Sequence, residues 1–217
     1  MDTASARTLT VRTIALSLSA LLLAGCSAGV GSPAPSNADA GYSLGSQEPS
    51  PPAAEVIATG TVIDVDGDAQ LCLGAVMESY PPQCVGVPLE GWSWAGLEPD
   101  DESGTTRWGA YGMSGTYDGT SFTPTHTPVP LALFDTVARP EPINGEPGAA
   151  SEKELATIQE TITTLLEPDT HLTSGVEDGY LVVDVVWDDG TLQEAADEDF
   201  GRGVVVIRSA LWTVAIE

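Results

Sequence analysis

The feature that most constrains the fold is a nearly continuous apolar run, "GYLVVDVVW", at residues 179–187. A strand of this kind is buried on both faces, as in sheets that are covered by helices. Asp189 and Gly190 then turn the chain, residues 191–200 have apolar side chains at helical spacing, and a second apolar run, "GVVVIRSALWTVAI", follows. A strand, a short helix and another strand predict a right-handed crossover with both strands parallel.

Two helices are expected in the second half of the chain. Ser151 and Glu154 form a capping box before an apolar stripe that Pro168 ends. Thr191 and Glu194 form a second capping box. We therefore expect a small two-layer α/β unit over residues 151–217. A Pro/Gly-rich connector over residues 136–150 precedes it.

The first half has the signals of a β-rich module over residues 56–135. Short runs rich in Val, Ile and Thr flank "DVDGD", which reads as a hairpin loop, and two further runs flank the hairpin dipeptide Asp118-Gly119. Several short strands with frequent turn signals predict an antiparallel barrel or sandwich. The fold class expected for the whole chain is therefore α+β.

Four aromatic residues in this module raise the question of a binding site. Trp92 and Trp94 alternate in "GWSWAG" and would share a face on a strand, and Trp108 and Tyr111 follow. Such a group predicts a platform for a carbohydrate or a peptide. The alternative is that these rings form the core of a small β-domain, which needs large apolar side chains in any case.

The three cysteines divide into one near the N-terminus and a pair. Cys72 and Cys84 are separated by 12 positions, with Pro81 and Pro82 in the loop between them. Because the N-terminus predicts export, this pair predicts a disulfide. No metal or cofactor is expected, since His126 and His171 show no ligand spacing.

The N-terminus has the organisation of an export signal. Arg7 and Arg12 precede the uncharged stretch "IALSLSALLLAG", which is too short to remain as a membrane-spanning helix. The stretch ends in a motif that resembles the bacterial lipobox and consists of Leu23, Ala24, Gly25 and Cys26. This resemblance implies transfer of diacylglycerol to Cys26 and cleavage before it, so that residues 1–25 are a signal peptide. The alternative is an ordinary secretory signal that happens to contain a cysteine.

Residues 26–55 are expected to form a lipidated, flexible tether. The segment is dominated by Ser, Ala, Gly and Pro and shows no apolar period. The alternative is a folded N-terminal arm that lies on the domain. The blocks "LCLGAVMESYPPQC" and "DDGTLQEAADEDFGRGVVVIRSAL" resemble uncharacterised exported lipoproteins of high-GC Gram-positive bacteria, a resemblance that implies no activity and no site residues.

The charge of the chain limits its partners. The formal net charge is −25, and loss of Arg7, Arg12 and Asp2 with the signal lowers it to −26. So acidic a protein is not expected to bind nucleic acid or anionic lipid electrostatically. The expected partners are the membrane, through acyl chains on Cys26, and an envelope glycan, peptide or protein.

No catalytic set is recognisable in the sequence. Asp184 interrupts the apolar run, and Arg202 or Arg208 could pair with it; alternatively it lies on a half-exposed face. The expected function is that of a lipid-anchored protein on the extracytoplasmic face of the cell membrane, with a non-catalytic binding or structural role. The alternative is an envelope enzyme whose site is assembled across the fold.

Overall fold

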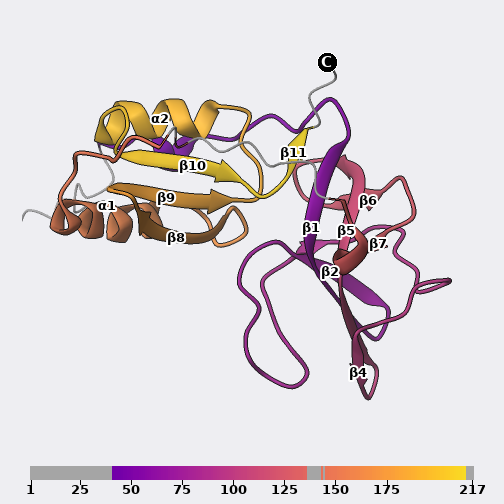
Figure 1. Ribbon diagram of the computed structural model, residues 1–217. Coiled ribbons are helices and arrows are strands. Elements are labelled where there is room, and N and C mark those ends of the chain that lie inside the picture. The colour runs from indigo at the N-terminus through magenta and orange to yellow at the C-terminus, as the bar shows by residue number, and fades with distance from the viewer. Residues whose placement is uncertain (1–40, 136–142, 144, 214–217) are drawn as a thin grey trace, which may run out of the picture. The chain divides into compact units, whose positions relative to one another are not determined.

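A computed structural model describes residues 41–135, 143 and 145–213, which belong to one compact unit (Figure 1). The predicted signal peptide, Cys26 and the tether up to residue 40 lie outside the described residues. Within the described ranges, none of the helices has both the length and the apolar character that crossing a bilayer requires.

The described elements are two α-helices, two short 3₁₀ helices and eleven strands. In chain order they are η1 Leu44–Ser46, β1 Val56–Val65, β2 Asp68–Cys72, β3 Val87–Pro88, β4 Asp101–Ser103, β5 Thr106–Tyr117, β6 Phe122–Pro124, β7 Val129–Pro130, η2 Leu131–Leu133, α1 Glu152–Leu165, β8 His171–Glu177, β9 Tyr180–Val185, α2 Thr191–Phe200, β10 Val205–Ser209 and β11 Trp212–Thr213. The expected α+β class is confirmed.

An antiparallel sheet of eight strands is organised around β1. Strand β5 pairs with β1 along its whole length, from Val56 opposite Gly115 to Val65 opposite Thr106. The two predicted hairpins are present. The first joins β1 to β2 through Asp66 and Gly67, which both have positive φ, and the second joins β5 to β6.

This sheet closes into a small barrel through the residues that follow β3. The Leu89 N–H donates to the carbonyl of Ala69 at the β2 edge, and the Glu90 N–H donates to the carbonyl of Phe122 in β6. Strands β2 and β6 are therefore hydrogen-bonded to the same short segment, which closes the ring β1-β2-β3-β6-β5. Within this ring, closure leaves fewer strand edges that could pair with other chains.

The barrel interior is an apolar cluster built from alternate residues of its strands. Its buried members are Val56, Ala58, Val62, Leu71, Val87, Leu89, Tyr111, Met113, Phe122, Val186 and Leu211. Gly115 of β5 is required here, because a Cβ at this position would collide with the ring of Phe122 and with the backbone of Thr123. The last two members of the cluster come from the C-terminal part of the chain.

The second sheet is three-stranded, with order β10-β9-β8, and it is mixed. Strands β9 and β10 are parallel and are joined by α2, as the strand-helix-strand pattern predicted, whereas β8 is antiparallel to β9. Helices α1 and α2 lie beside this sheet in Figure 1. Their apolar stripes share one core with Leu181, Val183 and Val185 of β9. This is the expected two-layer unit.

Each described end of the chain packs with the sheet that is farther from it in the sequence. Trp212 of β11 pairs with Ile57 of β1, so the last strand joins the first sheet. At the other end Leu44, fully buried, belongs to the core of α1, α2 and β9. The N–H groups of Ser43 and Leu44 donate to the carboxylate of Asp199, each at 2.8 Å.

The structure therefore differs from the expected flexible tether over residues 41–55, which form the folded arm that was the alternative. The Tyr42 ring stacks on Phe200, with ring centroids 5.2 Å apart. The composition of this segment gave no sign of the arm, because it is attached by one buried side chain, one stacked ring and backbone hydrogen bonds, and none of these produces a periodic pattern.

One predicted helix cap is present and the other differs. Ser151 accepts a hydrogen bond from the Glu154 N–H at the start of α1, as the capping box predicted. Helix α2 instead has Gly190 as its N-cap residue, in the left-handed region at φ 104°. The N–H groups of Leu192 and Gln193 donate to the carboxylate of Asp188. Thr191 is thus the first residue of the helix rather than its cap.

Candidate functional site

Three of the four predicted platform residues lie together at one end of the barrel. Trp92 and Trp94 come from the irregular segment between β3 and β4, and Tyr111 comes from β5. The ring centroids are 5.2 Å apart for Trp92 and Trp94, 5.4 Å for Trp92 and Tyr111 and 6.1 Å for Trp94 and Tyr111. All three contacts are edge-to-face, the geometry that aromatic rings prefer in a core.

A buried carboxylate orients this aromatic cluster. Asp64 of β1 is 3% exposed and accepts hydrogen bonds from the Trp94 indole Nε1 at 2.6 Å and from the Gly67 N–H at 2.7 Å. The Arg107 guanidinium lies 3.4 Å from the same carboxylate and 5.3 Å from the centre of the Trp94 ring. The Trp94 ring is therefore fixed by a hydrogen bond at its edge and a cation on its face.

Tyr111 is the most deeply buried member of the cluster. It is 1% exposed, and its hydroxyl donates to the Glu98 carbonyl at 2.6 Å. Burial raises the pKa of this phenol, and the negative charges of Asp100 and Glu98 add to the effect. Tyr111 is thus part of the core of the barrel, and it has little exposed surface that a ligand could contact.

Trp108 does not belong to this group. It lies three residues before Tyr111 on β5, so the two side chains point to opposite faces of the strand. Trp108 instead contacts Tyr80 edge-to-face, with ring centroids 5.4 Å apart. The odd separation of the two residues was the signal in the sequence that places them on different faces.

Trp92 lies between two surface hollows. One, of about 550 Å³, is lined by Trp92 together with Asp68, Gln70, Pro88 and Glu90. The other, of about 250 Å³, is lined by Gly91, Trp92, Ser93, Ala95 and Leu97 on one side and by residues 124–128 on the other. The sequence indicated Trp92 as a candidate binding residue but gave no signal for Gln70 and Glu90. These two residues reach the hollow because the segment after β3 is hydrogen-bonded to β2.

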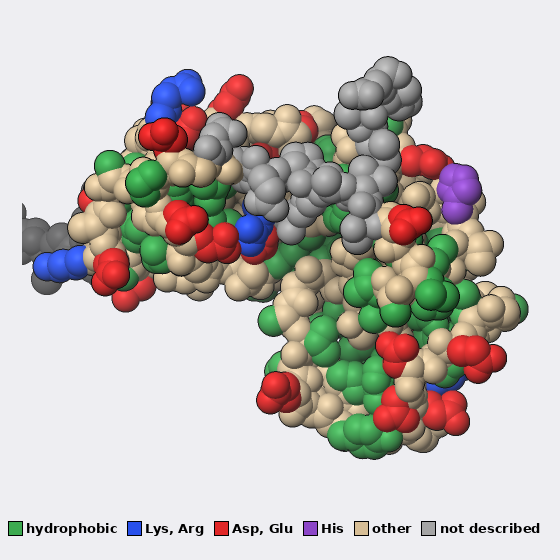
Figure 2. Space-filling view, viewed as in Figure 1, with side chains coloured by type: hydrophobic (Ala, Val, Ile, Leu, Met, Phe, Trp, Pro, Cys, Tyr) green, Lys and Arg blue, Asp and Glu red, His purple; other side chains and the backbone are tan. Residues whose placement is uncertain are grey.

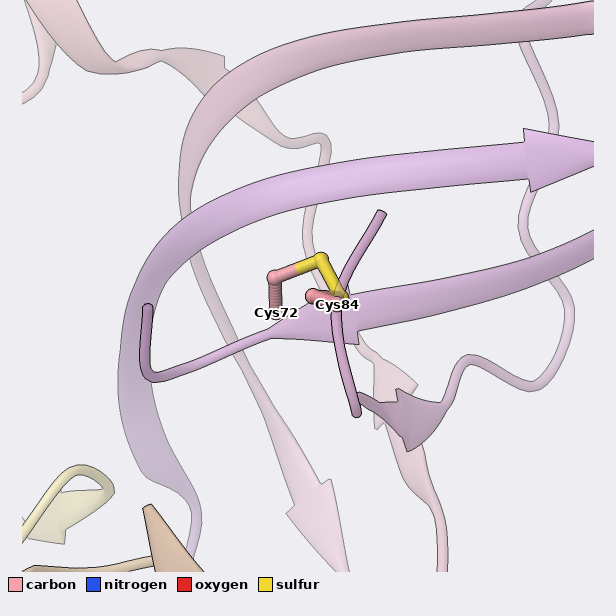
Figure 3. Close-up of a disulfide and its surroundings, with 2 residues drawn as sticks. All are labelled: Cys72 and Cys84. Carbon is pink, nitrogen blue, oxygen red and sulfur yellow. A yellow bond between two sulfur atoms is a disulfide. The ribbon is translucent and has the colours of Figure 1, made fainter. Parts of the chain in front are cut away.

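The predicted disulfide is formed between Cys72, at the end of β2, and Cys84, shortly before β3 (Figure 3). It closes a loop whose side chains include Met77 and Tyr80, both exposed, and the exposed Val85 follows directly after it. The Tyr80 hydroxyl donates to the Glu102 carbonyl at 3.2 Å, so the loop also contacts β4.

Of the two alternatives for Asp184, the structure shows the ion pair, with side chains that are 15% exposed for Asp184 and 20% exposed for Arg208. Arg208 donates to both carboxylate oxygens of Asp184, at 2.7 and 2.9 Å, and also contacts Glu177. The hydrogen bonds to Asp184 raise the pKa of Arg208 further above its ordinary value, against the effect of burial. Arg202 is 3.6 Å from Asp197 instead. The contacts of Arg208 join β8, β9 and β10 across the second sheet.

The described part of the chain contains no group of three or more His, Cys, Asp or Glu side chains that could hold a metal ion. His126 is exposed and lies 4.0 Å from Glu55, whereas His171 lies at the start of β8. The two histidines are therefore on different elements.

Comparison of the chain with protein-family models, with curated proteins and with solved structures gives no match.

Proposed function

We propose that the protein is a lipid-anchored, extracytoplasmic binding protein that holds a neutral glycan in the hollow beside Trp92. The observation that carries the proposal is the lining of that hollow, to which Trp92 contributes together with Gln70, Asp68 and Glu90. Sugar rings present apolar C–H faces that stack on an indole, and hydroxyl groups that bond to amides and carboxylates.

The acidity of the protein narrows the class of glycan. Acidic side chains are spread over the visible face in Figure 2, with few Lys or Arg side chains among them. A polyanionic ligand would be repelled by the net charge of −25, so the proposed glycan is uncharged.

An enzyme acting on glycans is the alternative, because Asp68 and Glu90 line the same hollow and glycoside hydrolysis uses two carboxyl groups. Both side chains are exposed, whereas the general acid of such enzymes is kept protonated by an apolar environment. Their exposure favours binding over hydrolysis.

The anchor in this proposal is Cys26. Its support is the lipobox resemblance, together with a disulfide of the kind that persists outside the cytoplasm. Two acyl chains on the first residue of the mature chain give stable attachment, which an acidic domain does not obtain from anionic lipid. Globomycin, which blocks lipoprotein signal cleavage, should cause an uncleaved precursor to accumulate in membranes. Unchanged release of soluble protein, or a native mass showing Cys26 without lipid, would refute the anchor.

Glycan binding is tested on the oxidised mature chain with a panel of neutral oligosaccharides built from N-acetylglucosamine, mannose, arabinose or galactose. We expect at least one to bind saturably by calorimetry, with no release of new reducing ends. Trp92→Phe and Gln70→Ala should each weaken binding about 5-fold or more. Trp108→Phe, the matched control on the opposite face of β5, should leave it unchanged. Absence of saturable binding across the panel would overturn the proposal.

A further inference from the structure

The two hollows at the end of the barrel adjoin each other, because Gly91 and Trp92 line both of them. The larger hollow continues from these residues to Gln70 of β2, and the smaller one continues to Thr127, in the segment between β6 and β7. A ligand that is longer than the larger hollow can therefore reach the smaller one by crossing the Gly91–Trp92 segment.

The surface above Gly91 leaves room for this crossing. Gly91 is exposed, and in the described part of the chain a Cβ atom added to it would meet nothing within 4 Å. Its φ of 68° lies in the left-handed region, where Asn is the best tolerated residue after Gly. The crossing is thus open in this protein, and an Asn at this position would place a side chain in it.

The sizes of the hollows favour one elongated site over two separate sites. Cavities that hold a small ligand commonly have about 300–1,000 Å³. The smaller hollow, of about 250 Å³, is below this range by itself, whereas the larger one, of about 550 Å³, lies within it. Taken together they remain within the range, so the smaller hollow fits the role of an extension of the larger one.

The linings of the two hollows differ in chemistry. Two carboxylates, those of Asp68 and Glu90, belong to the larger hollow and suit the donor hydroxyl groups of a sugar. Among the described residues that line the smaller hollow, none is acidic. Its lining combines apolar side chains with hydroxyl groups: Leu97, Pro124 and Pro128 with Ser93 and Thr127.

Ser93 provides a hydrogen-bond donor for the smaller hollow. Its Oγ accepts from the Ala95 N–H at 3.2 Å, and the part of the chain that the structure describes holds no acceptor for its own O–H. A ligand carbonyl beside Ser93 could accept this hydrogen, and a methyl group could pack against the apolar lining. An acetamido group carries both a carbonyl and a methyl group on one small substituent.

We propose that the site binds a linear N-acetylated oligosaccharide that crosses the Gly91–Trp92 segment, with an acetamido group in the smaller hollow. This inference rests on the proposed glycan binding and names the class of glycan. Sugar hydroxyl groups of the same chain donate to Asp68 and Glu90 in the larger hollow.

The test uses two tetrasaccharides with the same backbone and the same linkage. Chitotetraose has an acetamido group on every unit, and cellotetraose has a hydroxyl group in its place. In calorimetry with the oxidised mature chain, we expect chitotetraose to bind at least about 10-fold more tightly, because only the acetamido group buries a methyl and supplies the carbonyl. Chitotetraose should also bind at least about 10-fold more tightly than the N-acetylglucosamine dimer, which is too short to fill both hollows.

Two variants localise the second part of the site. Thr127→Trp should reduce the advantage of the tetramer over the dimer to less than about 3-fold, because the large indole fills the smaller hollow. Gly91→Asn should have the same effect by obstructing the crossing. Thr164→Trp, at an exposed position of α1, is the control and should leave the advantage unchanged.

Three results would overturn this inference and leave the proposed glycan binding intact. They are binding of cellotetraose, or of another neutral glycan in place of chitotetraose, with equal or higher affinity; equal affinity for tetramer and dimer; and a full tetramer advantage in Thr127→Trp. If no glycan binds, the proposed function fails, and this inference fails with it. The wild-type comparisons decide the matter if a variant does not fold.

Discussion

The Trp94 indole donates its Nε1–H to the carboxylate of Asp64 at 2.6 Å, inside one end of the barrel. Asp64 is 3% exposed, and it also accepts from Gly67 in the β1–β2 turn and lies beside Arg107. One carboxylate thus connects a hairpin turn, an aromatic cluster and strand β5.

Replacement of this carboxylate should destabilise the protein strongly. Asp64→Ala leaves the Trp94 and Gly67 donors without their acceptor, and we expect the free energy of unfolding to fall by about 2–4 kcal/mol. Urea unfolding followed by tryptophan fluorescence measures the change. Asp68→Ala, an exposed carboxylate in the same hairpin, is the control and should cost less than about 0.5 kcal/mol. Equal losses in the two variants would contradict the role given to Asp64.

The folded arm makes a second prediction. Leu44→Ala should lower the free energy of unfolding by about 2–4 kcal/mol, because Leu44 is fully buried in the core of α1, α2 and β9. Glu48→Ala, an exposed residue of the same segment, should change it by less than about 0.5 kcal/mol. Thermal unfolding of the two variants gives the comparison. A negligible effect of Leu44→Ala would mean that the segment is a flexible tether after all.

Loss of the disulfide should weaken the fold without abolishing it. The loop between Cys72 and Cys84 is short, with a sequence separation of 12, and the chain-entropy relation gives about 2–3 kcal/mol for its closure. A variant with both cysteines changed to serine should show this loss in urea unfolding. Adding reductant should lower the stability of the wild type toward that of the variant and leave the variant unchanged. Any further loss in the variant would show that reductant acts elsewhere.

The partly buried His171 predicts a dependence of stability on pH. Burial lowers the pKa of His171 from the ordinary value of 6.5, so near pH 6 the unfolded chain binds more protons at this ring than the folded chain. The free energy of unfolding should therefore fall as the pH drops from about 7.5 to about 5.5. His171→Gln should reduce this decrease, measured as the difference in Tm between the two pH values. An unchanged difference would show that other groups cause it.

Local patterns predicted much of this fold. Asp-Gly and related turns marked both hairpins, helical spacing marked α1 and α2, and the continuous apolar run marked β9 as a buried strand. Each of these features depends on residues close together in the sequence. The disulfide between Cys72 and Cys84 followed from the number of cysteines and the expected export.

The features that the sequence did not predict depend on contacts between distant residues. Among the described residues 41–55, Leu44 alone is fully buried, so no period shows where it packs. The pairing of Trp212 with Ile57 joins residues more than 150 positions apart. The hollow beside Trp92 was also not predictable, since Gln70 reaches it only through the closure of the barrel.

The packing of the N-terminal arm against α2, rather than against the sheet that contains β1, has a mechanical consequence. The arm is held on α2 by Asp199, and β1 begins only after it, at Val56. A pulling force applied to the chain before residue 41 would therefore load the arm first. The arm would peel from α2 and lengthen before β1 bore any tension. A bound ligand at the barrel end would be shielded from the first part of any such stretch.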